Sequence, residues 1–126
     1  MPLTVKDMME AANAVVERID TARAQALMGQ GALLLDVRDG TELERTGRAK
    51  GAHHIPRGML EFRADDAVPS HDPELRKDRA IVLHCASGGR AALAGKLLKD
   101  MGYPEVYNLG GLSDWINAGG AVVGPE

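Results

Sequence analysis

The sequence contains a single cysteine, Cys85, among 126 residues. One cysteine can form neither an internal disulfide nor a multi-cysteine metal site, which is compatible with a reducing compartment, and we expect a cytoplasmic location. The chain also lacks a long apolar run near its N-terminus, so neither a signal peptide nor a membrane span is predicted. Solenoid-length repeats and low-complexity tracts are missing as well. The net charge of −3 gives no global attraction to nucleic acid or to an anionic membrane.

The length and composition predict one domain over residues 1–126, with enough apolar residues for a real core. Two continuous apolar runs, residues 32–35 and 80–84, are typical of strands that are buried on both faces. The remaining pattern predicts further strands over 15–19, 52–55 and 105–108, helices over 4–14, 22–28, 41–46, 90–101 and around 114–116, and an irregular segment over 62–78. Strands that alternate with helices indicate an α/β fold with a mostly parallel sheet.

The most informative segment is the loop that follows the second apolar run, Cys85-Ala86-Ser87-Gly88-Gly89-Arg90, called the cysteine loop below. It lies between a predicted strand and a predicted helix, where backbone N–H groups converge and the helix N-terminus adds positive potential. Its two glycines let the backbone approach an anion closely. We therefore expect a thiolate that acts as a nucleophile, held by the N–H groups of residues 86–90. The alternative is an inert cysteine packed as a small apolar side chain.

Asp36 and Arg38 follow the first apolar run, at the same end of the sheet as Cys85, which is where ligands bind in such folds. They could form a surface ion pair, cap the next helix, or brace the cysteine loop. Arg90 could favour an anionic substrate, steady the loop, or simply be a solvated residue at a helix start. Ser87 could donate its hydroxyl to the sulfur or only suit the turn.

Histidines occur at four positions, and their spacing matches no metal site with the cysteine. His53 and His54 are adjacent in a predicted strand and should point to opposite faces, which disfavours joint ligation. His84 adjoins Cys85, but its side chain should likewise point the other way. We expect all of them, with His71, to be core or surface residues, and we expect no metal.

Four segments in order resemble the signatures of a rhodanese-like domain: Leu-Asp-Val-Arg at 35–38, Lys-Gly-Ala-His-His-Ile-Pro at 50–56, the cysteine loop, and Leu-Gly-Gly-Leu-Ser-Asp-Trp at 109–115. The resemblance implies a three-layer α/β domain with about five strands in a central, mostly parallel sheet and helices on both faces. It also implies that the strands ending at Asp36 and Cys85 are neighbours. The family transfers sulfur through a cysteine persulfide and needs no organic cofactor.

The loop length separates two chemistries associated with this fold. Four residues lie between Cys85 and Arg90, as in sulfurtransferases, whereas related dual-specificity phosphatases have five. The shorter loop should suit one sulfur atom better than a phosphate, which argues against phosphatase or arsenate-reductase activity. Two positions depart from the family pattern: Arg48 replaces a frequent histidine, and Ala91 replaces a serine that often follows the loop arginine.

The sequence therefore predicts a thiosulfate sulfurtransferase-like enzyme with Cys85 as the catalytic residue. Residues 86–90 would form the substrate-binding loop, with Asp36 and Arg38 in support. Its partners would be a small sulfur donor, such as thiosulfate or a protein persulfide, and an external thiol or cyanide as acceptor. The alternatives are a weakly catalytic sulfur-carrier or protein-binding module and, less favoured, a cysteine phosphatase.

Overall fold

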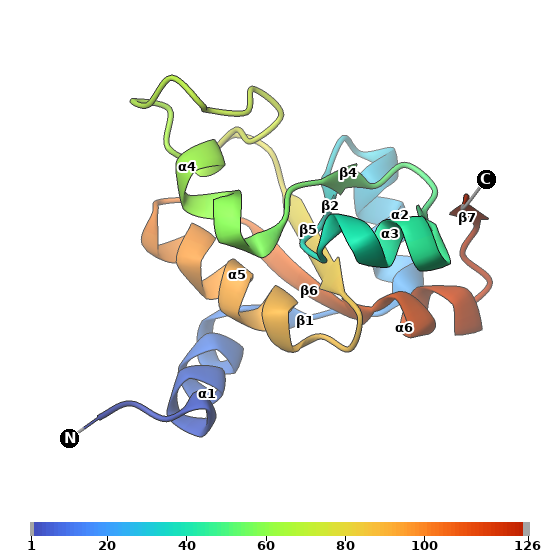
Figure 1. Ribbon diagram of the computed structural model, residues 1–126, viewed down its shortest axis with the longest axis horizontal. Coiled ribbons are helices and arrows are strands. Elements are labelled where there is room, and N and C mark those ends of the chain that lie inside the picture. Colours follow the sequence, from blue (N-terminus) through green and yellow to red (C-terminus); the bar gives the residue numbers. More distant parts are fainter. Residues whose placement is uncertain (1, 125–126) are drawn as a thin grey trace.

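A parallel five-stranded sheet forms the centre of the computed structural model, which describes residues 2–124 (Figure 1). Its strands are β1 (Glu17–Arg18), β2 (Leu33–Asp36), β4 (His53–His54), β5 (Ile81–Cys85) and β6 (Val106–Gly111). They lie in the order β1-β6-β5-β2-β4, so β5 is the middle strand. β2 pairs with β5 in parallel, which confirms that Asp36 and Cys85 end neighbouring strands. A small second sheet, which the sequence did not predict, pairs β3 (Arg48–Ala49) with β7 (Val122–Val123) in antiparallel fashion.

Six α-helices and one 3₁₀ turn surround the sheets in residues 2–124: α1 (Val5–Val15), α2 (Thr21–Gly29), α3 (Gly40–Thr46), η1 (Arg57–Met59), α4 (Leu60–Ala64), α5 (Gly89–Asp100) and α6 (Leu112–Asn117). The first two helices begin at side chains that accept hydrogen bonds from otherwise unpaired backbone N–H groups. Thr4 Oγ1 accepts from the Asp7 N–H at 3.1 Å, and Asp20 Oδ1 accepts from the Arg23 N–H at 2.8 Å. None of these helices has both the length and the apolar character that a bilayer crossing requires.

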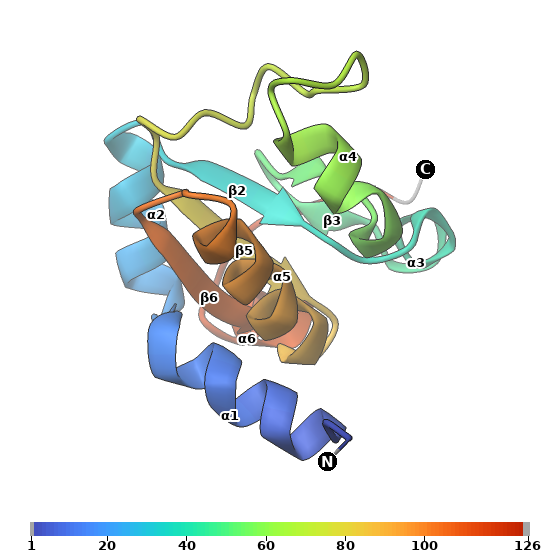
Figure 2. The same cartoon turned by 90° about the vertical axis from the view of Figure 1, so that its left-hand side faces the viewer.

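The predicted three-layer arrangement is confirmed, since helices cover both faces of the sheet (Figures 1 and 2). Alternate strand residues belong to two separate apolar clusters. Leu83 and Cys85 pack on the side of α4 and α5, whereas Val82 packs on the side of α2 and α6. By the same alternation the His84 side chain lies on the face opposite Cys85, as the sequence predicted.

The irregular segment after α4 is held by a buried polar contact. Asp72 is 4% exposed, and its Oδ2 lies 2.6 Å from His53 Nε2 and 3.3 Å from Arg63 Nη2. Burial alone would raise the pKa of Asp72, but the hydrogen bond from His53 and the nearby positive charges hold it below its ordinary value. His53 therefore has a structural partner that fastens this segment to the edge strand β4.

Candidate active site

Cys85 is the last residue of the central strand and is almost completely buried, with 1% of its surface exposed. The Gly88 N–H donates a hydrogen bond to its Sγ, with a nitrogen–sulfur distance of 2.9 Å. Among residues 2–124, no other residue of the cysteine loop donates its N–H to this sulfur, which is fewer than the sequence predicted. Ala86 and Ser87, the next two residues of the loop, are exposed. The sulfur is thus buried, with one backbone dipole directed at it.

The conformation of Gly88 directs this N–H to the sulfur. Its φ of +106° is in the left-handed region, which glycine adopts without the penalty that a Cβ imposes. Asn108 of β6 supports the same residue, because its Nδ2 donates to the Gly88 carbonyl oxygen at 3.2 Å and its Oδ1 accepts from the Gly110 N–H at 2.8 Å. Asn108 is 3% exposed. This buried amide joins the cysteine loop to the neighbouring strand.

Gly111 lets the cysteine loop pack directly on the end of β6. It is paired with Cys85 in the register of the two strands. A Cβ at this position would overlap the carbonyl oxygen of Ala86, so any other residue would displace the loop. The Gly111 N–H is satisfied by Asp114 Oδ2 at 2.8 Å. The close approach explains the glycine at position 111.

Arg90, the last residue of the cysteine loop, is bound to a carboxylate on α3. Its Nη1 and Nη2 donate to Glu42 Oε2 and Oε1 at 2.7 and 2.9 Å. The paired hydrogen bonds from Arg90 lower the pKa of Glu42 to about 2, and the same contact raises the pKa of Arg90 further above its ordinary value. Glu42 Oε2 also accepts from the Asp39 N–H at 2.8 Å. Arg90 therefore fastens α3 to the start of α5, consistent with the loop-steadying role considered from the sequence.

Asp36 and Arg38 form an ion pair, one of the roles that the sequence left open for them, and the pair is buried. Arg38 Nη2 donates to Asp36 Oδ2 at 2.8 Å and to the Gly47 carbonyl oxygen at 2.8 Å, while its Nη1 donates to Thr46 Oγ1 at 2.9 Å. Burial alone raises the pKa of Asp36, but the hydrogen bonds from Arg38 keep it below its ordinary value. Within residues 2–124 the Arg38 side chain donates hydrogen bonds to Asp36 and to the end of α3, and none to the cysteine loop.

The side chain of His84 lies between this ion pair and the backbone of Cys85. It is fully buried, its Nδ1 lies 3.2 Å from the Cys85 carbonyl oxygen, and its Nε2 lies 3.6 Å from Asp36 Oδ2. Nε2 has no hydrogen-bond partner among the described residues. Burial lowers the pKa of His84, which favours the neutral ring.

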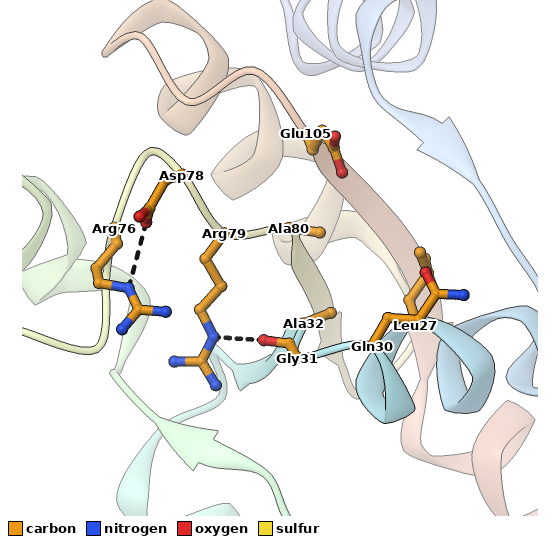
Figure 3. A pocket seen from close by; sticks show the side chains of 9 residues that line it. All are labelled: Leu27, Gln30, Gly31, Ala32, Arg76, Asp78, Arg79, Ala80 and Glu105. Carbon is orange, nitrogen blue, oxygen red and sulfur yellow. Dashed lines mark hydrogen bonds and ion pairs between the residues drawn. The ribbon is translucent and has the colours of Figure 1, made fainter.

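Two hollows lie at opposite ends of the sheet. One, of about 280 Å³, lies beside Ala86 between α3 and α6 and is called the α3–α6 depression below. The other, of about 260 Å³, is lined by Arg76, Arg79 and residues near the amino ends of the strands (Figure 3). Its arginines are already engaged, since Arg76 pairs with Asp78 and Arg79 Nε donates to the Gly31 carbonyl oxygen (Figure 3). Of these two hollows, the α3–α6 depression adjoins the cysteine loop.

The structure brings the residues of the cysteine loop together with supports that the sequence analysis missed, chiefly Glu42 and Asn108. A signal existed for Glu42, because an acidic residue three positions after Asp39 is typical of a helix start. Asn108 is a polar residue inside an otherwise apolar strand, which is a weaker signal for a buried hydrogen-bonding role.

Comparison with known proteins agrees with this geometry. A sulfurtransferase of Allochromatium vinosum is 34% identical over 95 residues, which are 75% of this chain and 80% of that protein. The thiosulfate sulfurtransferase GlpE of Pseudomonas syringae is 31% identical, over 79% of this chain and 86% of that protein. The solved structure of a Rhodopseudomonas palustris protein of unknown function, described as a possible tyrosine phosphatase, is 39% identical with a TM-score of 0.85 and covers 98% of this chain and 99% of its own. The family model for the rhodanese-like domain matches residues 20–118, and the chain belongs to that family.

Proposed function

We propose that this protein is a sulfurtransferase that carries sulfane sulfur as a persulfide on Cys85. The Cys85 thiolate attacks the outer sulfur of a donor such as thiosulfate. A bond forms between Sγ and that sulfur, the sulfur–sulfur bond of the donor breaks, and its electron pair leaves with sulfite. In the second step an external thiolate or cyanide attacks the terminal sulfur, and the bonding electrons return to Sγ. Charge is conserved in both steps.

The observation that carries the proposal is the Gly88 N–H at 2.9 Å from Cys85 Sγ. A backbone donor held in place by Asn108 stabilises negative charge on sulfur without reorganising during the reaction. Cys85 is only 1% exposed, so a slender terminal sulfur atom suits the approach to its Sγ better than a bulky group. The sulfurtransferases among its relatives support the same chemistry.

The acceptor in this proposal comes from outside the chain. Cys85 is its only cysteine, so no second thiol can resolve the persulfide as an internal disulfide. Small thiols, cyanide, or a thiol on another protein are the corresponding acceptor classes. We place the reaction in the cytoplasm, where thiols stay reduced.

Phosphatase activity is the second candidate, because of the possible tyrosine phosphatase from R. palustris. A phosphate bound over Cys85 would need cationic donors that face it. Both terminal nitrogens of Arg90 are committed to Glu42, and the loop is one residue shorter than in dual-specificity phosphatases. These features favour sulfur transfer. A module that only binds a partner or carries sulfur is the remaining alternative.

Intact-protein mass spectrometry tests the proposal. Wild-type protein and Cys85→Ser are treated with thiosulfate and then with cyanide. The wild type should gain the mass of one sulfur atom and lose it to cyanide, with thiocyanate released, and Cys85→Ser should gain nothing. Turnover of an aryl phosphate without any sulfur adduct would instead support the phosphatase. If neither thiosulfate, polysulfide nor a protein persulfide gave an adduct, the result would contradict sulfur transfer and support a module that only binds a partner.

A further inference from the structure

His84 directly precedes Cys85 in β5 and takes no part in the chemistry proposed above. Its side chain has no exposed surface and points to the face of the sheet opposite the sulfur. Burial of an ionisable side chain costs free energy, because its polar atoms lose water and need partners inside the protein. The contacts of the two ring nitrogens therefore define the role of this residue.

The Nδ1 atom of His84 is a hydrogen-bond donor. It lies 3.2 Å from the Cys85 carbonyl oxygen, and a carbonyl oxygen only accepts, so Nδ1 carries a proton. Burial lowers the pKa of His84 and favours the neutral ring, which has one proton in total. The contact joins the imidazole to the peptide group between Cys85 and Ala86, which is the first peptide of the cysteine loop.

The Nε2 atom of His84 has no hydrogen-bond partner within residues 2–124. With the proton on Nδ1, Nε2 presents a lone pair, and Asp36 Oδ2, also an acceptor, lies 3.6 Å away. That carboxylate accepts hydrogen bonds from Arg38 instead. Buried polar atoms without a partner are uncommon in native proteins. The ring thus satisfies the Cys85 carbonyl and leaves its other nitrogen unsatisfied, which indicates that the contact to Cys85 is the functional one.

The first peptide of the cysteine loop sets the course of the residues that follow. Only Ala86 and Ser87, both exposed, separate Cys85 from Gly88, whose N–H donates to Sγ at 2.9 Å. Rotation of the first peptide would carry the Gly88 N–H away from the sulfur, because so short a link has little freedom to compensate. Hydrogen bonds weaken steeply when their geometry is lost. A donor on the Cys85 carbonyl resists this rotation.

We propose, on the basis of the sulfur-transfer function above, that His84 is a positioning residue that acts through the Cys85 carbonyl. Its Nδ1–H group holds the first peptide of the cysteine loop, and the loop in turn keeps the Gly88 N–H on the sulfur. His84 touches neither donor nor acceptor and exchanges no proton with them. Its contribution is therefore the same for every sulfur donor.

Three substitutions separate the two ring nitrogens. The amide of His84→Asn places a donor near the position of Nδ1, that of His84→Gln places one near Nε2, and His84→Leu fills the space without a donor. His84→Asn should form the persulfide with thiosulfate within about twofold of the wild-type rate, because the hydrogen bond is kept. His84→Gln and His84→Leu should be about threefold to tenfold slower, as expected for the loss of one hydrogen bond.

Alkylation by iodoacetamide is a second readout, and it needs no sulfur donor. Cys85 is the only cysteine, so the rate reports this thiolate alone. The variants should rank in the same order as for persulfide formation, and urea unfolding confirms that each is folded under the conditions of the assay. Nitrogen-15 NMR of the wild-type rings checks the tautomer without any substitution. A His84 ring that lacks a proton on Nδ1 would overturn the proposal.

His71 provides the matched control. Its Nε2 lies 3.1 Å from the Leu75 carbonyl oxygen, so His71→Leu removes a contact of the same kind outside the cysteine loop. Both rates should stay unchanged in this variant. The proposal is overturned if His84→Asn is slowed as much as His84→Gln, or if neither is slowed. A wild type that forms no persulfide with any donor would overturn the proposed function instead, and the alkylation rates would then still decide whether His84 positions the thiolate.

Discussion

Replacing Glu42 by glutamine removes the charge that binds Arg90 and keeps the size of the side chain. Pairing with Arg90 lowers the pKa of Glu42 from 4.5 to about 2, which corresponds to about 3 kcal/mol at about 1.4 kcal/mol per pH unit. The Arg90 side chain is 37% exposed, so solvent screening reduces this figure, and we expect the pair to contribute about 1 to 2 kcal/mol to the free energy of unfolding.

A double-mutant cycle measures that contribution directly. Urea unfolding of the wild type, Glu42→Gln, Arg90→Gln and the double variant should give a coupling free energy of about 1 to 2 kcal/mol near pH 7. Glu44→Gln on the same helix is the control, because Glu44 is exposed and forms no ion pair within residues 2–124. It should change stability by less than about 0.5 kcal/mol.

The pH dependence of the coupling follows from the lowered pKa of Glu42. A carboxyl whose pKa is lower in the folded state than in the unfolded state stabilises the fold above its unfolded pKa. This stabilisation should be lost progressively as the pH falls from about 4.5 towards about 2. The coupling free energy should therefore be smaller at about pH 3 than at about pH 7. A coupling near zero at neutral pH, or one that does not change with acidification, would refute the assignment of Arg90 to Glu42.

Two further substitutions test the supports of the site. Gly111→Ala should destabilise the protein by about 1 to 3 kcal/mol and reduce persulfide formation, because the new methyl group overlaps the Ala86 carbonyl. The control is Gly29→Ala on α2, where a Cβ meets no atom within 4 Å, and it should retain both properties. Equal behaviour of the two variants in urea unfolding would contradict the close packing. Asp36→Asn should cost about 3 to 5 kcal/mol, because it leaves the buried Arg38 without its counter-charge, and a loss below about 1 kcal/mol in the same assay would show that the pair is not as buried as described.

Much of the fold followed from local patterns in the sequence. The apolar runs at 32–35 and 80–84 became the neighbouring buried strands β2 and β5, because a strand covered on both faces needs apolar residues at every position. The caps of α1 and α2 are also local features, because the donor and the acceptor of each capping hydrogen bond are only three residues apart.

The supports of the site were harder to predict because they join distant residues. Arg90 and Glu42 are 48 positions apart, and nothing in either segment says which carboxylate the arginine reaches. Asn108 lies 20 positions from the Gly88 carbonyl to which it donates. The second sheet pairs two strands of two residues each, which are too short to leave a periodic signal. In each case the contact depends on how distant segments of the chain pack together and not on the local sequence.

The most direct test of the account is the mass of the intact protein after exposure to thiosulfate. The account predicts one added sulfur atom on Cys85, removed by cyanide and missing in Cys85→Ser. An adduct that persists in Cys85→Ser would contradict it, and so would a wild-type protein that stays unmodified with every sulfane donor.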